Sequence, residues 1–236
     1  MRGRLRAAWL LVALSVSAAE AGLADRIGAT FSFMSAEFVK AFEPQEGVVV
    51  AVEGDTVFLD LGEQSGVQVG REFVVFRKGD PFRHPITGKV IGRYETVLGH
   101  AQVRSVSGEF SEALFVAGRD RPGPRPEDSV RISRGRIKVA ITPLLDLTGG
   151  TADVRRVPYL FASVLDRTKR FQVVDPFAVT DMFASGGTRV EEVLARPARA
   201  VHVGKNLDVA GWLVPVLMER RGTVFLDVTY ISAITG

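Results

Sequence analysis

The sequence predicts an α+β protein in which a small antiparallel β-barrel or sandwich module precedes an α/β domain with a mixed sheet. Residues 46–112 consist of short β-branched and aromatic runs that glycine turns interrupt every several residues, a pattern typical of small all-β modules. From residue 137 onward, apolar strand-like runs alternate with helical segments, as they do in α/β domains. The boundary is expected near Gly135, which gives a β domain at 46–134 and an α/β domain at 135–236.

The composition is that of a globular chain with a hydrophobic core. Of the 236 residues, 46% are hydrophobic and 24% are charged, which are ordinary values for folded domains. The net charge of +3 lies mostly in residues 1–21, where three arginines oppose one glutamate, and the remainder carries +1. A body so close to neutral gives no reason to expect nucleic acid or an anionic membrane as a partner.

Residues 1–21 have the pattern of a secretory signal peptide. Three arginines are followed by the apolar run 7–16, and Ala19-Glu20-Ala21 matches the small-x-small cleavage site. Cleavage after Val16-Ser17-Ala18 would also fit this pattern. Ten apolar residues are too few to cross a bilayer as a helix. The alternative interpretation is an uncleaved N-terminal helix that packs on the body of the protein.

The chain contains no cysteine. Disulfides, thiolate metal ligands and a thiol nucleophile are therefore excluded. No acceptor cysteine follows the signal, so the protein is not expected to be a lipoprotein. No later apolar run approaches the length of a transmembrane segment. We expect a protein of the bacterial periplasm, exported by a cleaved signal peptide.

Residues 22–45 are predicted to form an amphipathic helix. Large apolar side chains recur there at spacings of four and three, and Pro44 ends the pattern; they are Leu23, Ile27, Phe31, Met34, Phe38 and Phe42. We expect this face to pack on the β module. The alternative is a helix that docks on another subunit, because these side chains would otherwise face water.

The β module is expected to contain strands separated by glycine and proline turns. Gly54-Asp55 is a tight hairpin turn, and the loop at 119–126, with its three prolines, lies near the end of the domain. The predicted strands are 48–52, 56–61, 73–77, 90–96, 99–106, 113–117 and 129–133.

The α/β domain is expected to begin with a strand buried on both faces, because residues 137–145 form a continuous apolar run. Pro158 should lie in the first turn of the next helix. The further strands are 171–174, 209–218 and 224–231, and the helices are 154–166, 176–183, 190–195 and 198–207. A last strand is missing after Ile234-Thr235-Gly236, so the sequence is expected either to be truncated at the C-terminal end of this domain or to take that strand from elsewhere.

No group of residues has the spacing of a catalytic or metal site. The histidines are His84, His100 and His202, and none has a second ligand at a spacing such as H-E-x-x-H. A G-x-S-x-G nucleophile motif is absent as well. We therefore predict no enzyme activity, no catalytic residues, no bound metal and no cofactor.

Two glycine-rich positions have simpler explanations than ligand binding. Gly149-Gly150 follows a strand, but the G-x-G-x-x-G and P-loop signatures are absent, so an ordinary turn is expected. Asp60 and Asp146 lie at strand ends beside glycines, where turn hydrogen bonding accounts for an aspartate.

The most exposed turn predicted is residues 80–85. Phe82, Arg83 and His84 place an aromatic ring, a cation and an imidazole on a segment bounded by Pro81 and Pro85. Such a stiff loop can contact another protein at low entropic cost. We predict these three residues as a partner-binding site, and the alternative is a stiff hairpin connection.

Two parts of the chain resemble known families. The segments EGDTVFLDLG, GVQVGREFVVFR, HPITG and LGHAQV, within residues 47–111, resemble the C-terminal β domain of the flagellar assembly protein T family. The segments IKVAITPLLDLTGG, LFASVLDRTKRFQVVD and HVGKNLDVAGWLV resemble an α/β domain shared by the middle part of that family, the N-terminal part of TolB and the curli secretion component. The order of the two domains is inverted relative to flagellar assembly protein T.

The resemblance implies a periplasmic protein without catalysis that helps to build an envelope structure, which in the flagellar family is a ring around the basal body. Its implied partners are other periplasmic or outer-membrane proteins, within a larger ring or oligomer. Two alternatives remain open at this point. One is an accessory component of an outer-membrane secretion system, and the other is a cell-wall glycan-binding module, since small barrels also bind oligosaccharides.

Overall fold

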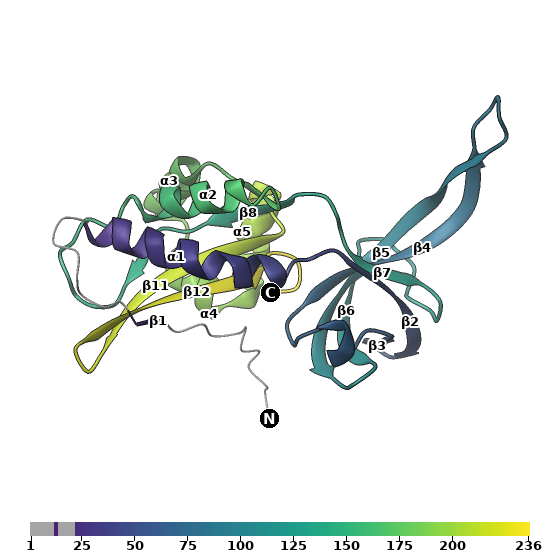
Figure 1. Ribbon diagram of the computed structural model, residues 1–236, viewed down its shortest axis with the longest axis horizontal. Helices are drawn as coiled ribbons and strands as arrows, with labels where there is room; N and C mark the ends of the chain where they lie inside the picture. The colour runs from purple at the N-terminus through teal and green to yellow at the C-terminus, as the bar shows by residue number, and fades with distance from the viewer. Residues whose placement is uncertain (1–11, 14–21) are drawn as a thin grey trace. The chain divides into compact units, whose positions relative to one another are not determined.

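The computed structural model describes residues 12–13 and 22–236, so almost all of the predicted signal peptide lies outside the described residues. The described chain forms two compact units (Figure 1). One, the barrel unit, covers Phe42–Arg134, and the other, the α/β unit, covers Gly135–Gly236 together with the helix that precedes the barrel. The predicted fold class, an antiparallel β module followed by an α/β domain with a mixed sheet, is confirmed.

The barrel unit is a closed, fully antiparallel barrel in the order β2-β3-β6-β5-β4-β7. Closure leaves the barrel body without an open sheet edge. A single turn of 3₁₀ helix, η1 (Glu63–Ser65), follows β3. The strands are β2 (Gln45–Glu53), β3 (Thr56–Leu59), β4 (Glu72–Arg83), β5 (Val90–Val106), β6 (Ser111–Ala117) and β7 (Ser129–Ile132).

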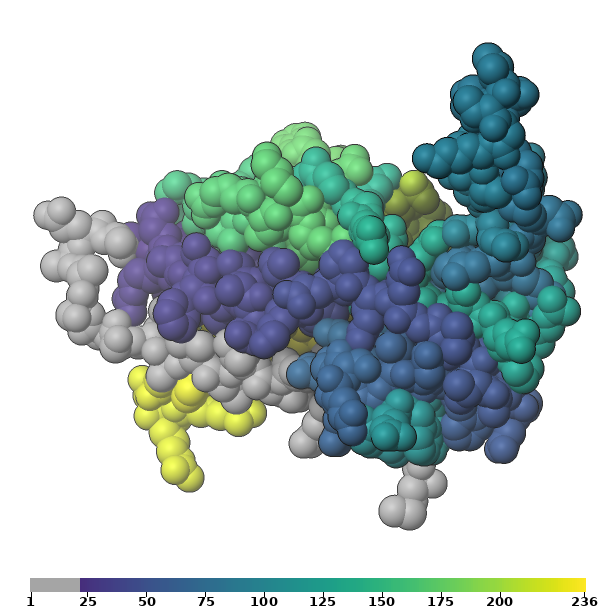
Figure 2. Space-filling view, turned by 45° about the vertical axis from the view of Figure 1, so that its right-hand side comes forward, coloured from purple at the N-terminus to yellow at the C-terminus, as the bar shows by residue number. Residues whose placement is uncertain are grey.

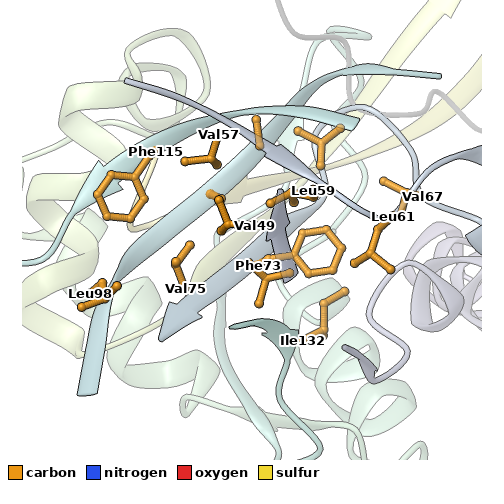
Figure 3. Close-up of a cluster of buried hydrophobic side chains, with 14 residues drawn as sticks. Val49, Val57, Leu59, Leu61, Val67, Phe73, Val75, Leu98, Phe115 and Ile132 are labelled. Atoms are coloured by element: carbon orange, nitrogen blue, oxygen red, sulfur yellow. The ribbon is translucent and has the colours of Figure 1, made fainter. Parts of the chain in front are cut away.

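Side-chain alternation along the strands fills the barrel interior (Figure 3). On β3, Val57 and Leu59 are fully buried, and on β4, Phe73 and Val75 are fully buried. This period of two is what a strand with one buried face requires. Gly54 turns β2 into β3 with φ of +59°, a conformation that glycine adopts without strain.

Two predicted elements of the barrel unit need correction. The strands expected at 90–96 and 99–106 are one continuous strand, β5, and β4 runs to Arg83 instead of ending at Arg77. The turn therefore lies at residues 84–89, and Pro81 sits within a strand. Register shifts between Lys78 and Pro81 interrupt the β4–β5 ladder there, and a proline is tolerated at such an irregularity because the ladder does not need its N–H.

The α/β unit contains a mixed sheet in the order β1-β12-β11-β8-β10. β10–β8 and β8–β11 are parallel, whereas β11–β12 is an antiparallel hairpin, and β9 pairs in parallel with β11. The strands are β1 (Val12–Ala13), β8 (Ile137–Ile141), β9 (Leu145–Asp146), β10 (Phe171–Val173), β11 (Gly211–Arg220) and β12 (Thr223–Ser232). The helices are α1 (Leu23–Lys40), α2 (Val157–Arg167), α3 (Pro176–Ala184), α4 (Val190–Ala195) and α5 (Pro197–Leu207).

Proline starts three of these helices. Pro158, Pro176 and Pro197 each lie in a first helical turn, where the missing N–H has no intrahelical acceptor in any case. The carboxylate of Asp175 caps α3 by accepting a hydrogen bond from the Phe177 N–H at 3.0 Å. Pro158 thus lies in the first turn of its helix, as the sequence predicted.

The sequence predicted that helix α1 packs on the barrel, but the helix packs within the α/β unit (Figure 1). Phe31 stacks on Phe161 of α2 with ring centroids 3.8 Å apart, and Phe38 stacks on Phe171 of β10 at 5.5 Å. Gly28 permits this approach, because a Cβ there would lie 2.9 Å from a methyl carbon of Leu160. The helical period identified the buried face correctly but contains no information about which surface covers it.

Tight packing on the other side of the sheet fixes α5. Trp212 of β11 is fully buried and donates its indole N–H to the Ala200 carbonyl at 3.0 Å. A Cβ at Gly204 would lie 2.4 Å from the Cβ of Ala233, so only glycine allows this contact. None of the helices in the described part of the chain combines the length and the hydrophobicity that a membrane-spanning helix needs.

Candidate functional site

The β4–β5 hairpin continues well past the barrel wall and forms an arm (Figure 1). We define the arm as residues 78–97, nearly all of which are exposed. Figure 2 shows it as a column of atoms that rises clear of the barrel body. Below the arm, the same two strands are buried at Val75 and Leu98. The arm is therefore an extension of the barrel's own strands and not a separate loop.

The arm is unusually apolar for a segment so exposed. Among the described residues, fourteen large apolar side chains are exposed, and six of them lie within the arm. Exposed apolar groups concentrated in this way mark contact surfaces in soluble proteins. The six, with their exposed fractions, are Phe82 (37%), Ile86 (89%), Val90 (44%), Ile91 (57%), Tyr94 (66%) and Val97 (42%).

The distal part of the arm is cationic. Between Phe82 and Arg93 the charged residues are Arg83, Lys89 and Arg93, and this stretch contains no aspartate or glutamate. Arg83 donates to the Gly88 carbonyl at 3.1 Å, and Arg93 donates to the Gly79 carbonyl at 3.2 Å. A carbonyl does not neutralise a guanidinium, so three positive charges accompany the apolar side chains.

Aromatic packing stiffens the middle of the arm. The rings of Phe82 and Tyr94 lie 5.3 Å apart in a tilted arrangement. Gly92 lies directly opposite Phe82, and a Cβ at Gly92 would come within 2.6 Å of the phenyl ring. The ring thus lies across the glycine, a cross-strand arrangement that compensates for the missing side chain. This packing orders the arm, and an ordered surface loses little conformational entropy when it forms a contact.

His84 closes the turn at the tip. Its N–H donates to the Lys89 carbonyl at 2.8 Å, and its own carbonyl accepts from Gly88 at 2.9 Å. Its Nδ1 accepts from the N–H groups of Ile86 and Thr87 at 3.2 and 3.3 Å. The His84 ring thus holds the turn together. The side chain of Ile86, within this turn, is exposed to solvent.

Two ionic clusters fix the base of the arm. Arg77 donates from Nε and Nη2 to the two oxygens of Asp128, each at 2.7 Å. Asp128 also accepts from the Arg125 N–H at 2.8 Å, which ties the proline-rich loop to β4. The hydrogen bonds to Asp128 raise the pKa of Arg77. The carboxylate is almost fully buried, so this pair is one of the stronger contacts of the barrel unit.

The second cluster lies on β7. The Arg131 guanidinium lies over the ring of Phe76 with 4.1 Å to the centroid, within the range of a cation–π contact. The Arg131 guanidinium also forms a 2.7 Å ion pair with Glu95 of β5. Glu95 is therefore paired at the base of the arm, and the other acid close in sequence to the distal cations is Asp80, three residues before Arg83.

The three residues predicted as a binding site all lie on the arm but have different roles in the structure. Phe82 packs on Gly92 and Tyr94, Arg83 lies beside the turn, and His84 holds the turn. Sequence reasoning missed Ile86, Ile91 and Tyr94. The alternation V-I-G-R-Y-E was a visible strand signal, but a strand pattern does not distinguish an exposed apolar residue from a buried one.

The other positions considered from the sequence have structural explanations. Asp146 accepts from the N–H and hydroxyl of Thr148 at 2.8 and 2.7 Å, and Asp60 accepts from the Val48 N–H at 2.6 Å. Gly149 turns with φ of +72°, and α2 begins only at Val157, so this turn does not lead directly into a helix. Among the described residues, no three potential ligands gather as a metal site would require.

A small cavity of about 270 Å³ lies in the α/β unit. Its lining includes Leu144, Val154, Arg155 and Tyr159. Arg155 already pairs with Asp153 at 2.7 Å, and this contact lowers the pKa of Asp153 to about 2. An apolar hollow of this size with its cation already paired lacks the convergent polar groups that orient a small ligand.

Comparison with known proteins adds one distant relative. No family model matches the chain. An uncharacterized protein of Aquifex aeolicus (strain VF5) is 32% identical over 107 residues, which are 45% of this chain and 21% of that protein. The chain thus spans about a fifth of the length of the curated relative it matches.

Proposed function

We propose that this chain is a non-enzymatic assembly or scaffold protein of the periplasm, and that the arm binds other envelope proteins. The observation that carries the proposal is the concentration of exposed apolar side chains on a preformed hairpin. An apolar surface of this kind costs free energy in water and is stabilised when another macromolecule covers it.

The chemistry of the arm indicates the kind of surface it fits. Ile86, Ile91 and Tyr94 supply apolar contact area, and Tyr and Arg side chains are enriched where protein interfaces are strongest. Arg83, Lys89 and Arg93 add three positive charges nearby. The partner surface we propose is therefore an apolar patch or groove rimmed by carboxylates, because complementary charge favours both encounter and register.

The location and the larger assembly are part of the same proposal. The signal-like pattern of residues 1–21 supports export to the periplasm, and the resemblance of residues 47–111 to flagellar assembly protein T supports a role in a ring around the flagellar basal body. N-terminal sequencing of the protein from a periplasmic fraction tests the first point. A mature N-terminus at or near Gly22 is expected, and an intact Met1 would contradict it.

Site-specific photo-crosslinking tests the arm. A photoreactive residue replaces Ile86, which is 89% exposed, in the protein expressed in its own envelope. Leu147, 59% exposed in the α/β unit, is the matched control position. We expect a discrete adduct from position 86 that is absent from position 147. The adduct should be lost when Ile91→Asp is added, because that carboxylate opposes the proposed acidic rim and reduces apolar contact.

Two outcomes would contradict the proposal. One is the same set of adducts from positions 86 and 147, which would indicate random collision. The other is an adduct from position 86 that survives both Ile91→Asp and Tyr94→Ser, which would mean that the arm's apolar side chains do not form the contact. Mass spectrometry of the adduct identifies the partner and tests the basal-body ring.

A further inference from the structure

The outer edge of the mixed sheet in the α/β unit is formed by β12 (Figure 1). On its inner side β12 pairs with β11 along all ten residues, from Thr223 to Ser232, without a register shift. On its outer side the described part of the chain provides one neighbour, β1, which pairs at Leu226 and Phe225. The opposite edge of the sheet, β10, is three residues long.

The β12 edge has few of the features that protect edge strands from pairing. The sequence T-V-F-L-D-V-T-Y-I-S contains no lysine, arginine or proline, and the regular ladder shows no bulge. Long, regular and apolar edges of this kind template the addition of another strand. The charged residue, Asp227, is 7% exposed, and burial raises its pKa.

The chain itself shows that this edge accepts a strand. Val12 and Ala13 pair with it in antiparallel fashion, and both belong to the apolar run of the predicted signal peptide. Removal of residues 1–21 would therefore take the seated segment away from Leu226 and Phe225. The processed protein would then have a ten-residue apolar strand at the border of its sheet.

We propose that the β12 edge of the processed chain pairs with β12 of a second copy, so that two mixed sheets join into one across a twofold axis. This proposal rests on the proposed export, because removal of the leader is what vacates the edge. It concerns a different surface from the arm, so the two contacts can be tested separately.

The hairpin geometry determines which backbone groups face the second copy. Arg221 and Gly222 both have positive φ, at 53° and 76°, which makes the β11–β12 connection a two-residue hairpin of the I′ kind. The flanking pair Arg220–Thr223 then exchanges hydrogen bonds within the hairpin, and alternate residues from Val224 turn their N–H and C=O outward. Leu226, paired with Val12, and Val228 belong to this outward set.

The position of Asp227 disfavours one register, and the side-chain pairs favour another. A twofold axis perpendicular to the sheet keeps side chains on their own faces, so it must lie midway between the two copies of one residue of β12, which then face each other. An axis at Asp227 would oppose the two carboxylates, which is unfavourable. An axis at Val228 instead places Asp227 opposite Thr229, Phe225 opposite Ile231 and Leu226 opposite Tyr230. These aromatic and β-branched pairs are the combinations that stabilise antiparallel ladders.

Cysteine cross-linking tests the register directly, because the native chain has no cysteine. In the chain beginning at Gly22, Val228→Cys would lie opposite its own copy with Cα atoms about 5.5 Å apart, within disulfide reach. Val224→Cys is the matched control on the same strand and face, about 27 Å from its copy. Under mild oxidation we expect a disulfide-linked dimer from Val228→Cys and a monomer from Val224→Cys.

A second measurement does not depend on cysteine. Sedimentation of the unmodified chain from Gly22 should give twice the monomer mass, and Val228→Pro should give the monomer, because proline removes an outward N–H while leaving the β11 ladder intact. Val228→Ala keeps that N–H and should remain dimeric. Tryptophan emission from buried Trp212 shows that each variant is folded.

Several results would overturn the inference. They are a monomeric unmodified chain, equal cross-linking from positions 224 and 228, and a dimer that persists in Val228→Pro. Since no partner is present in these assays, their failure would leave the arm proposal standing, and an arm without adducts would leave the dimer standing.

Discussion

Removal of the Asp128 carboxylate tests whether the base of the arm is held by the ion pair with Arg77. Asp128→Ala removes three hydrogen bonds, two from the Arg77 guanidinium and one from the Arg125 N–H. Breaking a fully buried pair costs about 3–5 kcal/mol. Arg77 is 25% exposed and keeps its bond to the Gly123 carbonyl, so water can partly replace the lost partner. We expect a loss of about 2–3 kcal/mol.

The two units can be followed separately because their aromatic residues differ. Trp212 is buried in the α/β unit, and the other tryptophan, Trp9, lies in the predicted leader. Tryptophan fluorescence of the processed chain therefore reports the α/β unit, whereas hydrogen exchange along β4 and β7 reports the barrel unit. For a domain of this size, 2–3 kcal/mol corresponds to a fall of about 8–24 °C in the unfolding temperature. We expect that fall in the barrel unit and an unchanged Trp212 transition.

The conservative variant Asp128→Asn is the control. Its amide oxygen can still accept one hydrogen bond, but the charge that strengthens the contact to Arg77 is gone, so an intermediate loss is expected. The reasoning fails if Asp128→Ala changes barrel stability by less than about 0.5 kcal/mol, as an ordinary surface substitution does. It also fails if the Trp212 transition moves as far as the barrel transition.

Two further predictions concern the α/β unit. Phe31→Ala should lower its stability by about 3–5 kcal/mol, because the ring that stacks on Phe161 is buried and its loss leaves a cavity; Trp212 fluorescence during urea unfolding measures this, and a loss below about 1 kcal/mol would contradict the packing of α1. Asp227→Asn should raise the unfolding temperature at pH 7. Burial raises the pKa of Asp227 in the folded protein above its ordinary 3.8, so the folded protein loses stability as pH rises from about 3.8 through the raised value. An asparagine side chain carries no charge and avoids this loss. The gain from Asp227→Asn should therefore vanish below about pH 3.8, where the wild-type carboxyl group is protonated in both the folded and the unfolded state.

Much of the fold could be predicted from the sequence because its signals are local. The period of two in T-V-F-L identified β3, and the apolar run from Ile137 identified β8. Pro158 in a first turn and the positive φ of Gly54 followed from the limited conformations open to these residues. What the sequence could not supply was the partner of each apolar face. Helix α1 was expected on the barrel and lies on α2.

The candidate site was predicted in position but not in extent. Phe82, Arg83 and His84 drew attention because prolines bound them, and they do lie on the arm. The length of the arm was missed because Pro81 was interpreted as a loop residue, although an exposed hairpin with a register shift accommodates proline. Ile91 and Tyr94 were interpreted as ordinary strand residues, since exposure depends on what lies across the sheet and not on the local pattern.

The exposed apolar side chains and strand edges of the described residues indicate where contacts with other chains could form. Barrel closure removes every sheet edge from the barrel body, so the arm is where that unit exposes unpaired strand and apolar side chains together. In the mixed sheet, β10 is too short to add much pairing, whereas β12 presents an edge of ten residues whose side chains are buried or half-buried. The arm thus exposes apolar side chains, whereas β12 offers a strand edge for backbone pairing. If the arm binds another protein and β12 pairs with its own copy, as proposed, one chain connects its own copies to a different protein, which is what a scaffold requires.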